Sequence, residues 1–578
     1  MTRKRFWTKP GGAFLIGGLV GLIIFALLYD IRIVNPTNVN WIWRSVTHDT
    51  AQHQLGWEFY RQTGSHGIIK GLLYPGGISM VFMDVIPLLA LIFKPFAGVL
   101  PTNFQYFGLW GLACYVLMGA LAAVIMQKVW RKVNRGTHDD SLWQVPFLAA
   151  SALIFCMSSV VMARQFYHPA LAGQWIILLG FLLIIDTLHF QRSRSLVIAW
   201  SLVLGLTILI HPYFLPMMGV LMMVSYARFW KRILPRRKPW RRLIRMLVMA
   251  IIPAAVSMII FYLIGGFSQG SGAEIHDLSE KGFNFLSFVN SYGYSAFVPA
   301  IPTKSHSPES MMWLGLGVLL TILLAACLTF GHYKHGWRRI KNFIQSYKME
   351  SIIAGIFCLL LLIFSIGTRA DVGPITLWEF QTSGVIDKLW TAFRAAAREA
   401  WPFYYGVILT AIVWLSFIMK RHVSTSKLPV VLAVCLCALA VVQTVDIRYS
   451  AAGINKRIGF KNSSQADAEF KALNLTDIYG SQKNLVPIDA NFRYDQSGTY
   501  VIGRTALKYG MTMGIGFYAR VPDSQKAIQT KWRNKVKDGK LSKSDLKDNL
   551  FMTIDPTTAD KAANKYQVLS DGRYYFIF

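Results

Sequence analysis

Acidic residues are scarce in this sequence, and charged residues of both signs are few. The 578 residues contain 29 Asp and Glu against 60 Lys and Arg, and charged residues make up 15% of the chain. Soluble globular chains carry about 25% charged residues. Together with 54% hydrophobic residues, this composition excludes a soluble single domain, a disordered chain and a fibrous chain. It predicts a mainly α-helical, polytopic membrane protein.

Cysteine is also scarce, and none lies where it could stabilise an exposed domain. All six cysteines fall inside apolar runs, which excludes a disulfide framework, and their spacing matches no metal-binding motif. The sequence also lacks a fixed-period repeat and an A-x-A-like cleavage site after its first apolar run. We therefore expect that run to remain as a membrane helix rather than to be removed as a signal peptide.

Apolar runs near the length that crosses a bilayer, about 20 residues, occur along most of the chain. Pro212 separates two short runs, because proline disfavours helix at the preceding residue. Residues 78–100 are apolar but interrupted by Asp84 and by prolines, so we expect them to lie at the membrane face without crossing. The eleven predicted spans are residues 11–29, 104–127, 143–163, 173–187, 196–210, 214–227, 246–264, 309–331, 351–366, 401–418 and 428–445.

The distribution of positive charge predicts the orientation of these spans. With a cytoplasmic N-terminus, the inner segments hold 27 Lys and Arg in 79 residues, and the outer loops hold 12 in 164. Cytoplasmic loops collect Lys and Arg, so this orientation is favoured. Much of the net charge of +31 then reflects topology and attraction to membrane lipids, and we expect no nucleic-acid partner.

An odd number of spans places the C-terminus outside, after a membrane domain at 1–445 with a large first outer loop at 30–103. Residues 446–578 have no long apolar run, which predicts a small extracytoplasmic α/β domain. Within it, the patterns favour strands at 498–504, 549–555 and 573–578 and helices at 464–473 and 523–538.

Polar and titratable side chains gather at the outer ends of the predicted spans. They come from separate segments, and the topology brings them to one side of the membrane. The arginine guanidinium suits phosphate binding, and a carboxylate can remove a proton from an attacking hydroxyl. The candidate site residues are Asp49, His53, Tyr60, Arg61, Asp84, Arg164, His168, His211, Arg394 and Arg398.

The first group of candidates also has a purely structural interpretation. Asp49 precedes Gln52 by three residues, a spacing typical of a helix N-cap with a capping-box partner. Asp49, His53 and Tyr60 share one face of the helix that follows. A polar stripe of this kind is usually a solvated face.

The other candidates have structural alternatives as well. Asp84 could stabilise a turn before a proline. His168 and His211, both followed by proline, could bond only to loop backbone. Arg394 and Arg398 are spaced one helical turn apart and could extend to lipid headgroups.

Several segments resemble sequence motifs of one protein family, and they occur in the same order along the chain. They include HDTAQHQLGWEFYR at 48–61, MDVIPLLALIFKP at 83–95, RQFYHPALAGQWIILL at 164–179, HPYF at 211–214, GFNFLSFVNSYGYSAFVPAIP at 282–302 and FRAAAREAWPFYY at 393–405. This ordered set resembles a bacterial family of uncharacterised polytopic membrane proteins. That family is similar to the type C (GT-C) glycosyltransferases.

The resemblance implies a GT-C fold and its chemistry. Such enzymes take a sugar from a polyprenyl-phosphate carrier on the outer membrane face and transfer it, with inversion, to a hydroxyl or amide. A first-loop acid commonly serves as the base, and Asp49 matches that position. Some GT-C enzymes need a divalent metal and others do not.

The sequence therefore predicts a bacterial plasma-membrane hexosyl- or pentosyltransferase acting on an envelope glycan or glycolipid. We expect Asp49 to be the base, and Asp84 to orient the acceptor or to be the alternative acid. A transporter or flippase of lipid-linked saccharides, and a non-catalytic membrane scaffold that binds an envelope polymer, are the alternatives. The residues expected to hold the carrier phosphate are Arg164, His168, Arg394 and Arg398.

Overall fold

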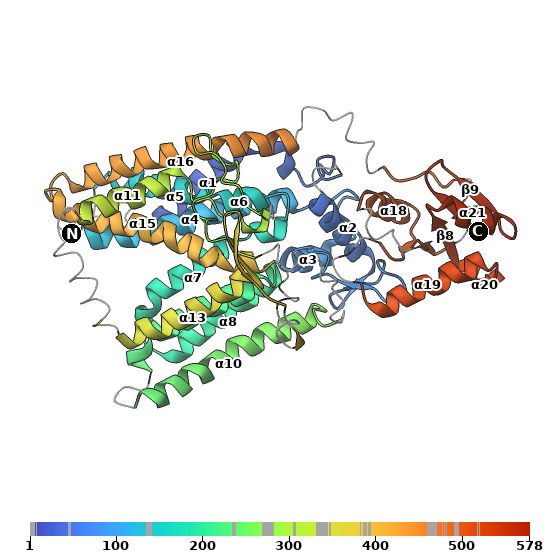
Figure 1. Cartoon of the computed structure of the whole chain (residues 1–578), viewed down its shortest axis with the longest axis horizontal. Coiled ribbons are helices and arrows are strands. Elements are labelled where there is room, and N and C mark those ends of the chain that lie inside the picture. The colour runs from blue at the N-terminus through green and yellow to red at the C-terminus, as the bar shows by residue number, and fades with distance from the viewer. Residues whose placement is uncertain are drawn as a thin grey trace.

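The protein is elongated, with a helical bundle at one end and a small sheet-containing part at the other (Figure 1). The N-terminus lies at the far end of the bundle, and the C-terminus lies in the sheet-containing part. The computed structural model describes residues 6, 9–43, 48–134, 141–233, 238–268, 282–304, 308–330, 345, 348–381, 383–384, 390, 393, 395–458, 471–476, 478, 480, 482–489, 496–516, 518 and 521–578.

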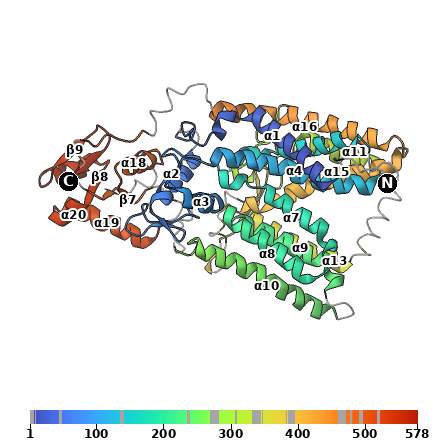
Figure 2. The ribbon, with the colours of Figure 1, turned by 180° about the vertical axis from the view of Figure 1, so that it is seen from behind.

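Each of the eleven predicted spans coincides with an apolar helix of the bundle. Their long axes run broadly along the long axis of the molecule (Figures 1 and 2). The helices are α1 (Pro10–Leu28), α4 (Phe107–Val133), α5 (Gln144–Cys156), α7 (Trp175–Asp186), α8 (Ser193–Ile210), α9 (Phe214–Arg228), α10 (Pro239–Leu263), α11 (Leu316–Phe330), α13 (Lys348–Ile366), α15 (Trp401–His422) and α16 (Leu428–Ile458).

Within the described residues, eight helices are long and apolar enough to cross a membrane, as in a polytopic membrane protein. Two of them gain their length from short 3-10 segments, which extend α7 to Pro169–His189 and α15 to Ala396–His422. The predicted spans at α5, α9 and α11 are shorter apolar helices. The sequence therefore predicts where the apolar helices lie. Eight of these described helices are long enough to cross a membrane, and α5, α9 and α11 are shorter.

Several predicted boundaries differ from the structure: α10 begins at Pro239 rather than at 246, α11 begins at Leu316 rather than at 309, and α4 continues to Val133 rather than ending at 127. The run 143–163 is not one helix, because α5 ends at Cys156 and a separate short helix, α6 (Ser159–Arg164), follows. The last apolar helix does not end near residue 445, since α16 continues to Ile458. Asp446 therefore belongs to this helix, and its carboxylate accepts hydrogen bonds from Trp313 Nε1 at 3.0 Å and the backbone N–H of Leu316 at 2.8 Å.

Glycines allow α1 and α4 to touch along their backbones. A Cβ atom added at Gly17 would lie 2.1 Å from the carbonyl oxygen of Gly119, and one added at Gly21 would lie 2.1 Å from that of Tyr115. Small residues spaced one turn apart are typical of closely packed membrane helices. This contact fixes the first helix against the longest predicted span.

The predicted first outer loop is a compact layer between the bundle and the C-terminal part (Figure 1). It holds α2 (His48–Thr63), α3 (Pro87–Phe93) and the 3-10 segment Lys94–Phe96. A small antiparallel sheet joins β1 (Gly64–Ser65), β2 (Ile68–Ile69) and β3 (Ile78–Ser79). Residues 78–100 are thus short elements rather than one long helix. A separate hairpin pairs β4 (Arg369–Val372) with β5 (Ile375–Glu379).

The C-terminal part contains a five-stranded sheet in the order β7-β6-β8-β10-β9. Pairing is parallel from β7 through β6 to β8 and antiparallel from β8 through β10 to β9. Its strands are β6 (Asn484–Pro487), β7 (Thr512–Met513), β8 (Asn549–Thr553), β9 (Val568–Ser570) and β10 (Tyr575–Ile577). Its helices are α18 (Gln496–Lys508), α19 (Asp523–Lys537), α20 (Lys543–Asp548) and α21 (Pro556–Ala563).

Three of the five predicted elements in this part are confirmed: the strands β8 and β10 and the helix α19. The strand predicted at 498–504 is wrong, because these residues lie in helix α18. The run from Thr499 to Gly503 is buried throughout, and a short apolar run buried on all sides fits a strand or a helix equally well. Of the helix predicted at 464–473, residues 464–470 lie outside the described residues, and 471–473 are not helical.

Candidate functional site

Asp49 and His168 form the first of two acid–histidine pairs. Asp49 lies in the first turn of α2, and its Oδ2 atom is 2.5 Å from Nδ1 of His168. The hydroxyl of the next residue, Thr50, donates a hydrogen bond of 2.7 Å to the carbonyl of Phe166. The start of α2 is therefore fastened to the segment that carries His168, and this brings the two side chains together.

Asp84 and His211 form the second pair. The Nε2 atom of His211 is 3.0 Å from Oδ1 of Asp84, and the backbone N–H of Tyr213 donates to His211 Nδ1 at 3.1 Å. Because Nδ1 accepts, a neutral His211 carries its proton on Nε2 and donates it to Asp84. His211 follows the last residue of α8, where proline ends the helix.

The backbone around Asp84 is held in an uncommon conformation. Asp84 and Ile86 have φ angles of 50° and 55°, in the left-handed region that residues other than glycine seldom adopt. The hydroxyl of Tyr106 donates a hydrogen bond of 2.5 Å to the carbonyl of Val85, between them. Such strain persists only where the surroundings fix it, and it clusters at functional sites.

His53 joins the two pairs into one cluster. It lies one helical turn after Asp49, and its Nε2 atom is 3.8 Å from Oδ2 of Asp84. Its side chain is buried, and its Nδ1 atom has no hydrogen-bond partner within the described chain. Asp49 and Asp84 also interact electrostatically with each other. We call Asp49, His53, Asp84, His168 and His211 the acid–histidine cluster.

Burial and mutual charge set the protonation of this cluster. Burial alone would raise the pKa of Asp49, but the imidazoles of His168 and His53 outweigh it and hold this pKa below its ordinary value. Burial opposes ionisation of Asp84 as well, yet the hydrogen bond and charge of His211 lower its pKa strongly. Burial lowers the pKa of His53 to about 4. Near pH 7 the cluster therefore holds two carboxylates and a neutral His53.

A second cluster, of two arginines and one glutamate, lies beside the first. Arg398 binds Glu309 with both ends of its fork, at 2.6 Å from Nε to Oε2 and 2.7 Å from Nη2 to Oε1. Arg164 Nη2 donates to Glu309 Oε2 at 2.9 Å. All three side chains are buried. This arginine–glutamate cluster has one net positive charge, and its arginines interact electrostatically with Asp49 and Asp84.

Tyr213 connects the two clusters. The guanidinium of Arg398 lies over its ring, 4.8 Å from the ring centre, and the ring of His211 stacks on it with centres 5.2 Å apart. A continuous path of contacts thus runs from Glu309 through Arg398, Tyr213 and His211 to Asp84. Four separate segments of the chain meet along this path.

The C-terminal part covers the acid–histidine cluster through α18. This helix packs against α2, and a Cβ atom added at Gly503 would lie 2.7 Å from the methyl groups of Leu55. Tyr500 is fully buried there, and burial together with the charge of Asp49 raises the pKa of its phenol. The carbonyl of Met513 accepts from Tyr74 N at 2.9 Å, and its own N–H donates to Gly71 at 2.8 Å.

The structural alternatives fail for most of the candidates that meet here. Asp49 lies inside α2 rather than before it, and its carboxylate faces His168, so it is not the N-cap. The polar stripe is not a solvated face, since His53 and Tyr60 are buried. Arg398 does not extend to lipid headgroups, because it is 8% exposed and bound to Glu309.

Two predicted site residues, Arg61 and Tyr60, lie away from the clusters. Arg61 donates hydrogen bonds to the carbonyls of Ala97, Leu100, Pro101 and Thr102, so it closes the loop between the first two long apolar helices. Tyr60 lies under Lys94, whose ammonium is 5.4 Å from its ring centre. Arg394 lies outside the described residues. The predicted helical turn shared with Arg398 is absent, because the helix begins at Ala396 and Ala395 is not helical.

Three residues of the site were missed by sequence reasoning. Glu309 is the single acid at the start of an apolar run. An ionisable residue in such a run is usually functional, so its position could have marked it as a site residue. Tyr213 follows the histidine–proline break, but nothing in the sequence marks its ring as a bridge. Tyr500 lies in residues 446–578, which the sequence predicts to be a separate domain.

The described residues do not present a ready metal site. No group of three or more His, Cys, Asp or Glu side chains among them is arranged to hold a metal ion. In the acid–histidine cluster, each carboxylate already faces an imidazole nitrogen, and Nε2 of His211 carries a proton. The residues present do not fit a metal ion, and we assign it no step.

Comparison with known proteins places the membrane part in one family. A family model described as a domain of unknown function (DUF6311) matches residues 18–448. This range includes every residue of the acid–histidine cluster and the arginine–glutamate cluster, and it leaves out α18. No curated protein and no solved structure matches the chain. Because the matched range covers most of its length, the chain belongs to the DUF6311 family.

Proposed function

We propose that this chain is a membrane glycosyltransferase that moves a sugar from a polyprenyl-phosphate carrier to a cell-envelope acceptor. The observation that carries the proposal is the pairing of Asp49 with His168 and of Asp84 with His211 in one buried cluster, beside two buried arginines. Carboxylates suit the acceptor hydroxyl, and guanidiniums suit the leaving phosphate. The resemblance to GT-C enzymes points to the same reaction.

In the proposed reaction, the acceptor hydroxyl attacks the anomeric carbon of the sugar. The Asp49 carboxylate takes the hydroxyl proton as the new C–O bond forms, and the bond from the anomeric carbon to the phosphate oxygen breaks. The configuration inverts, and polyprenyl phosphate leaves with the bonding electron pair. Asp84, held by His211, accepts a hydrogen bond from the acceptor and orients it.

Arg164 and Arg398 stabilise the charge that develops on the leaving phosphate. Preorganised cations in a water-poor site contribute strongly to such catalysis. Glu309 keeps both guanidiniums in place before the donor binds, because each hydrogen-bonds to its carboxylate. The two arginines and Glu309 together carry one net positive charge, which can attract the phosphate. The phosphate would bind next to the Glu309 carboxylate, and the ion pairs between Glu309 and the arginines would stay intact.

The proposed setting is the outer face of the bacterial plasma membrane. Eleven crossings from a cytoplasmic N-terminus put α2, the clusters and the C-terminal part on that face. The excess of Lys and Arg in the opposite loops supports this orientation. The three shorter helices, α5, α9 and α11, would cross as parts of the bundle.

The proposal is tested by comparing cells with and without this protein. We expect loss of the protein to remove a sugar from an envelope glycan or glycolipid and to raise the amount of its polyprenyl-phosphate donor. The accumulated donor should react with a membrane-impermeant oxidant, because it lies on the outer face. Accumulation confined to the inner leaflet would favour a transporter, and an unchanged profile of glycans and lipids would contradict both activities.

A further inference from the structure

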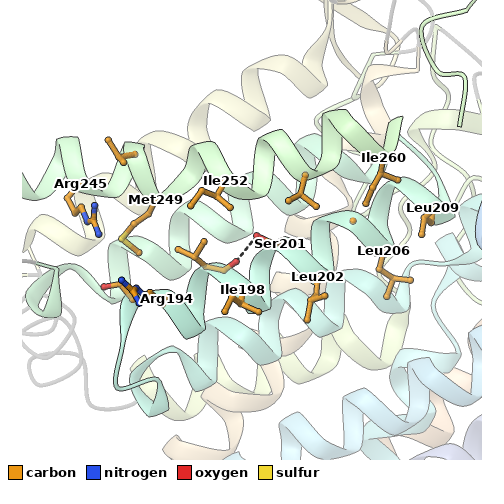
Figure 3. Close-up of a pocket in the computed structure, with 15 residues that line it drawn as sticks. Arg194, Ile198, Ser201, Leu202, Leu206, Leu209, Arg245, Met249, Ile252 and Ile260 are labelled. Carbon is orange, nitrogen blue, oxygen red and sulfur yellow. Dashed lines mark hydrogen bonds between the residues drawn. The ribbon is translucent and has the colours of Figure 1, made fainter. Parts of the chain in front are cut away.

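A groove of about 850 Å³ runs between α8 and α10, from the start of α8 to Leu209 near its end. Its wall is almost wholly aliphatic, and Figure 3 shows the side chains of Ile198, Leu202, Leu206 and Ile260 along it. The groove opens to the surface of the bundle, since Leu202 is 70% exposed and Ile252 is 55% exposed. Such a surface belongs in contact with lipid chains.

One end of this apolar groove is positively charged. Arg194 and Arg245 both lie at that end, while Leu209 and Ile260 lie at the other (Figure 3). Neither guanidinium forms an ion pair with a carboxylate in the part of the chain that the structure describes. Ser193 also lines this end. A groove that combines an aliphatic wall with two arginines at one end matches the shape and charge of an anionic lipid.

The position of the charged end narrows the kind of lipid. From Arg194 to Leu209 the helix rises by about 22 Å at 1.5 Å per residue, so an acyl chain that spans one hydrocarbon leaflet of about 15 Å occupies the part of the groove nearest the arginines. Arg194 lies in the first turn of α8, whereas His211 of the candidate site follows the last. A phosphate bound by these arginines is therefore at the opposite end of α8 from Asp84.

We propose that this groove binds an anionic glycerophospholipid. Its phosphate contacts Arg194 and Arg245, and one acyl chain lies along the wall between α8 and α10. The charged end favours a glycerophospholipid over the polyprenyl-phosphate donor, whose phosphate must reach the acid–histidine cluster. The choice of a glycerophospholipid over a polyprenyl phosphate rests on the proposed function, whereas the binding of an anionic lipid by this groove does not.

The test is native mass spectrometry of the full-length purified protein with added phosphatidylglycerol or phosphatidylcholine. We expect the wild-type protein to retain phosphatidylglycerol in preference to phosphatidylcholine. The double variant Arg194→Gln/Arg245→Gln should lose most of this preference, because each arginine near an anionic lipid contributes about fivefold in affinity. The matched control is Arg192→Gln/Arg241→Gln, which removes an exposed arginine just before α8 and one in α10, neither of which lines the groove.

A second variant tests the apolar part independently. Ser201→Phe places a ring in the middle of the groove, and we expect it to lower binding of phosphatidylglycerol with both arginines in place. Equal losses in the two arginine double variants would overturn the proposal, because binding would then follow overall charge. Binding of both lipids alike, or displacement of phosphatidylglycerol by an equal amount of undecaprenyl phosphate, would also overturn it.

Discussion

The ring of Tyr213 stacks on the imidazole of His211, with the ring centres 5.2 Å apart and the planes inclined by 30°. The guanidinium of Arg398 also lies over the Tyr213 ring, 4.8 Å from its centre. The residues proposed to hold the leaving phosphate are thereby placed in a fixed position relative to Asp84, which His211 binds. We expect the acid–histidine cluster and the arginine–glutamate cluster to act as a unit. A substitution in one cluster should therefore also change the geometry of the other.

Arg398→Lys should raise the apparent KM for the lipid-phosphate sugar by about tenfold or more, because lysine cannot copy the fork that binds Glu309 and lies on Tyr213. Steady-state kinetics with the donor that accumulates in cells lacking the protein would measure this. The control is Arg32→Lys, at an exposed arginine paired with Asp30. Wild-type kinetics in Arg398→Lys would remove this residue from the phosphate site.

Gly503→Leu should lower transfer by separating α18 from α2. The new side chain meets Leu55, which is fully buried and has no room to withdraw. The C-terminal part should then be released faster by limited proteolysis, while the membrane helices remain intact. Lys508→Leu adds the same residue on the exposed end of the same helix and should change neither property. Normal transfer in Gly503→Leu would show that α18 is dispensable for the site.

Glu58 should make stability depend on pH. Burial raises its pKa from 4.5 to about 7, even with Gln54, Arg504 and Arg61 nearby. Between about pH 4.5 and 7 the unfolded chain loses this proton while the folded chain keeps it, so the stability falls as pH rises, by about 3 kcal/mol in all. Below that window both states are protonated, and above it the loss is complete.

The substitution Glu58→Gln checks this prediction. It keeps the hydrogen-bonding oxygen and removes the ionisation, so the variant should unfold at a higher temperature than wild type at about pH 8 and at a similar temperature at about pH 4. Thermal unfolding of the purified proteins in detergent measures the difference. Glu379→Gln, at an exposed residue of β5, is the control. If the stability of Glu58→Gln depends on pH as that of the wild type does, groups other than Glu58 cause the pH dependence.

The orientation of the chain predicts the location of two reporter fusions. A reporter placed after Lys427 should be cytoplasmic, and one placed after Phe578 should be extracytoplasmic. Fusions to alkaline phosphatase, which is active outside the cytoplasm, and to green fluorescent protein, which fluoresces inside it, would measure both locations. A cytoplasmic signal at the C-terminus would mean that an even number of helices crosses the membrane, and the candidate site would need a new assignment to a face.

The sequence was most informative about the membrane helices and the acids of the first outer loop. Apolar runs near 20 residues have few alternatives to a helix in lipid, so each of the eleven runs contains an apolar helix, eight of them long enough to cross a membrane among the described residues. Asp49, Asp84, His168 and His211 are candidates because the predicted topology places their loops on one face. Which acid pairs with which histidine depends on the tilt and packing of α2, α8 and the loops, and no local pattern contains that information.

The misses share a physical cause: they depend on tertiary contacts between distant segments. Arg61 has the same charge as Arg164, but its long side chain reaches four loop carbonyls, while Arg164 meets Glu309. The pattern of residues 498–504 predicts a strand, but a short apolar run fits a strand or a helix equally well, and these residues lie in helix α18. The role of Tyr500 follows only from the docking of α18 over Asp49.

The central claim is that Asp49 is the catalytic base, and Asp49→Asn tests it most directly. The measurement is consumption of the accumulated lipid-linked sugar by cells lacking the protein, after each variant is returned to them at equal abundance. Asp186→Asn is the matched control, because Asp186 also contacts a histidine, His189, but lies at the opposite end of the bundle. We predict that Asp49→Asn lowers consumption by about a hundredfold or more, while Asp186→Asn stays near wild type. Near-normal consumption in Asp49→Asn would contradict the claim.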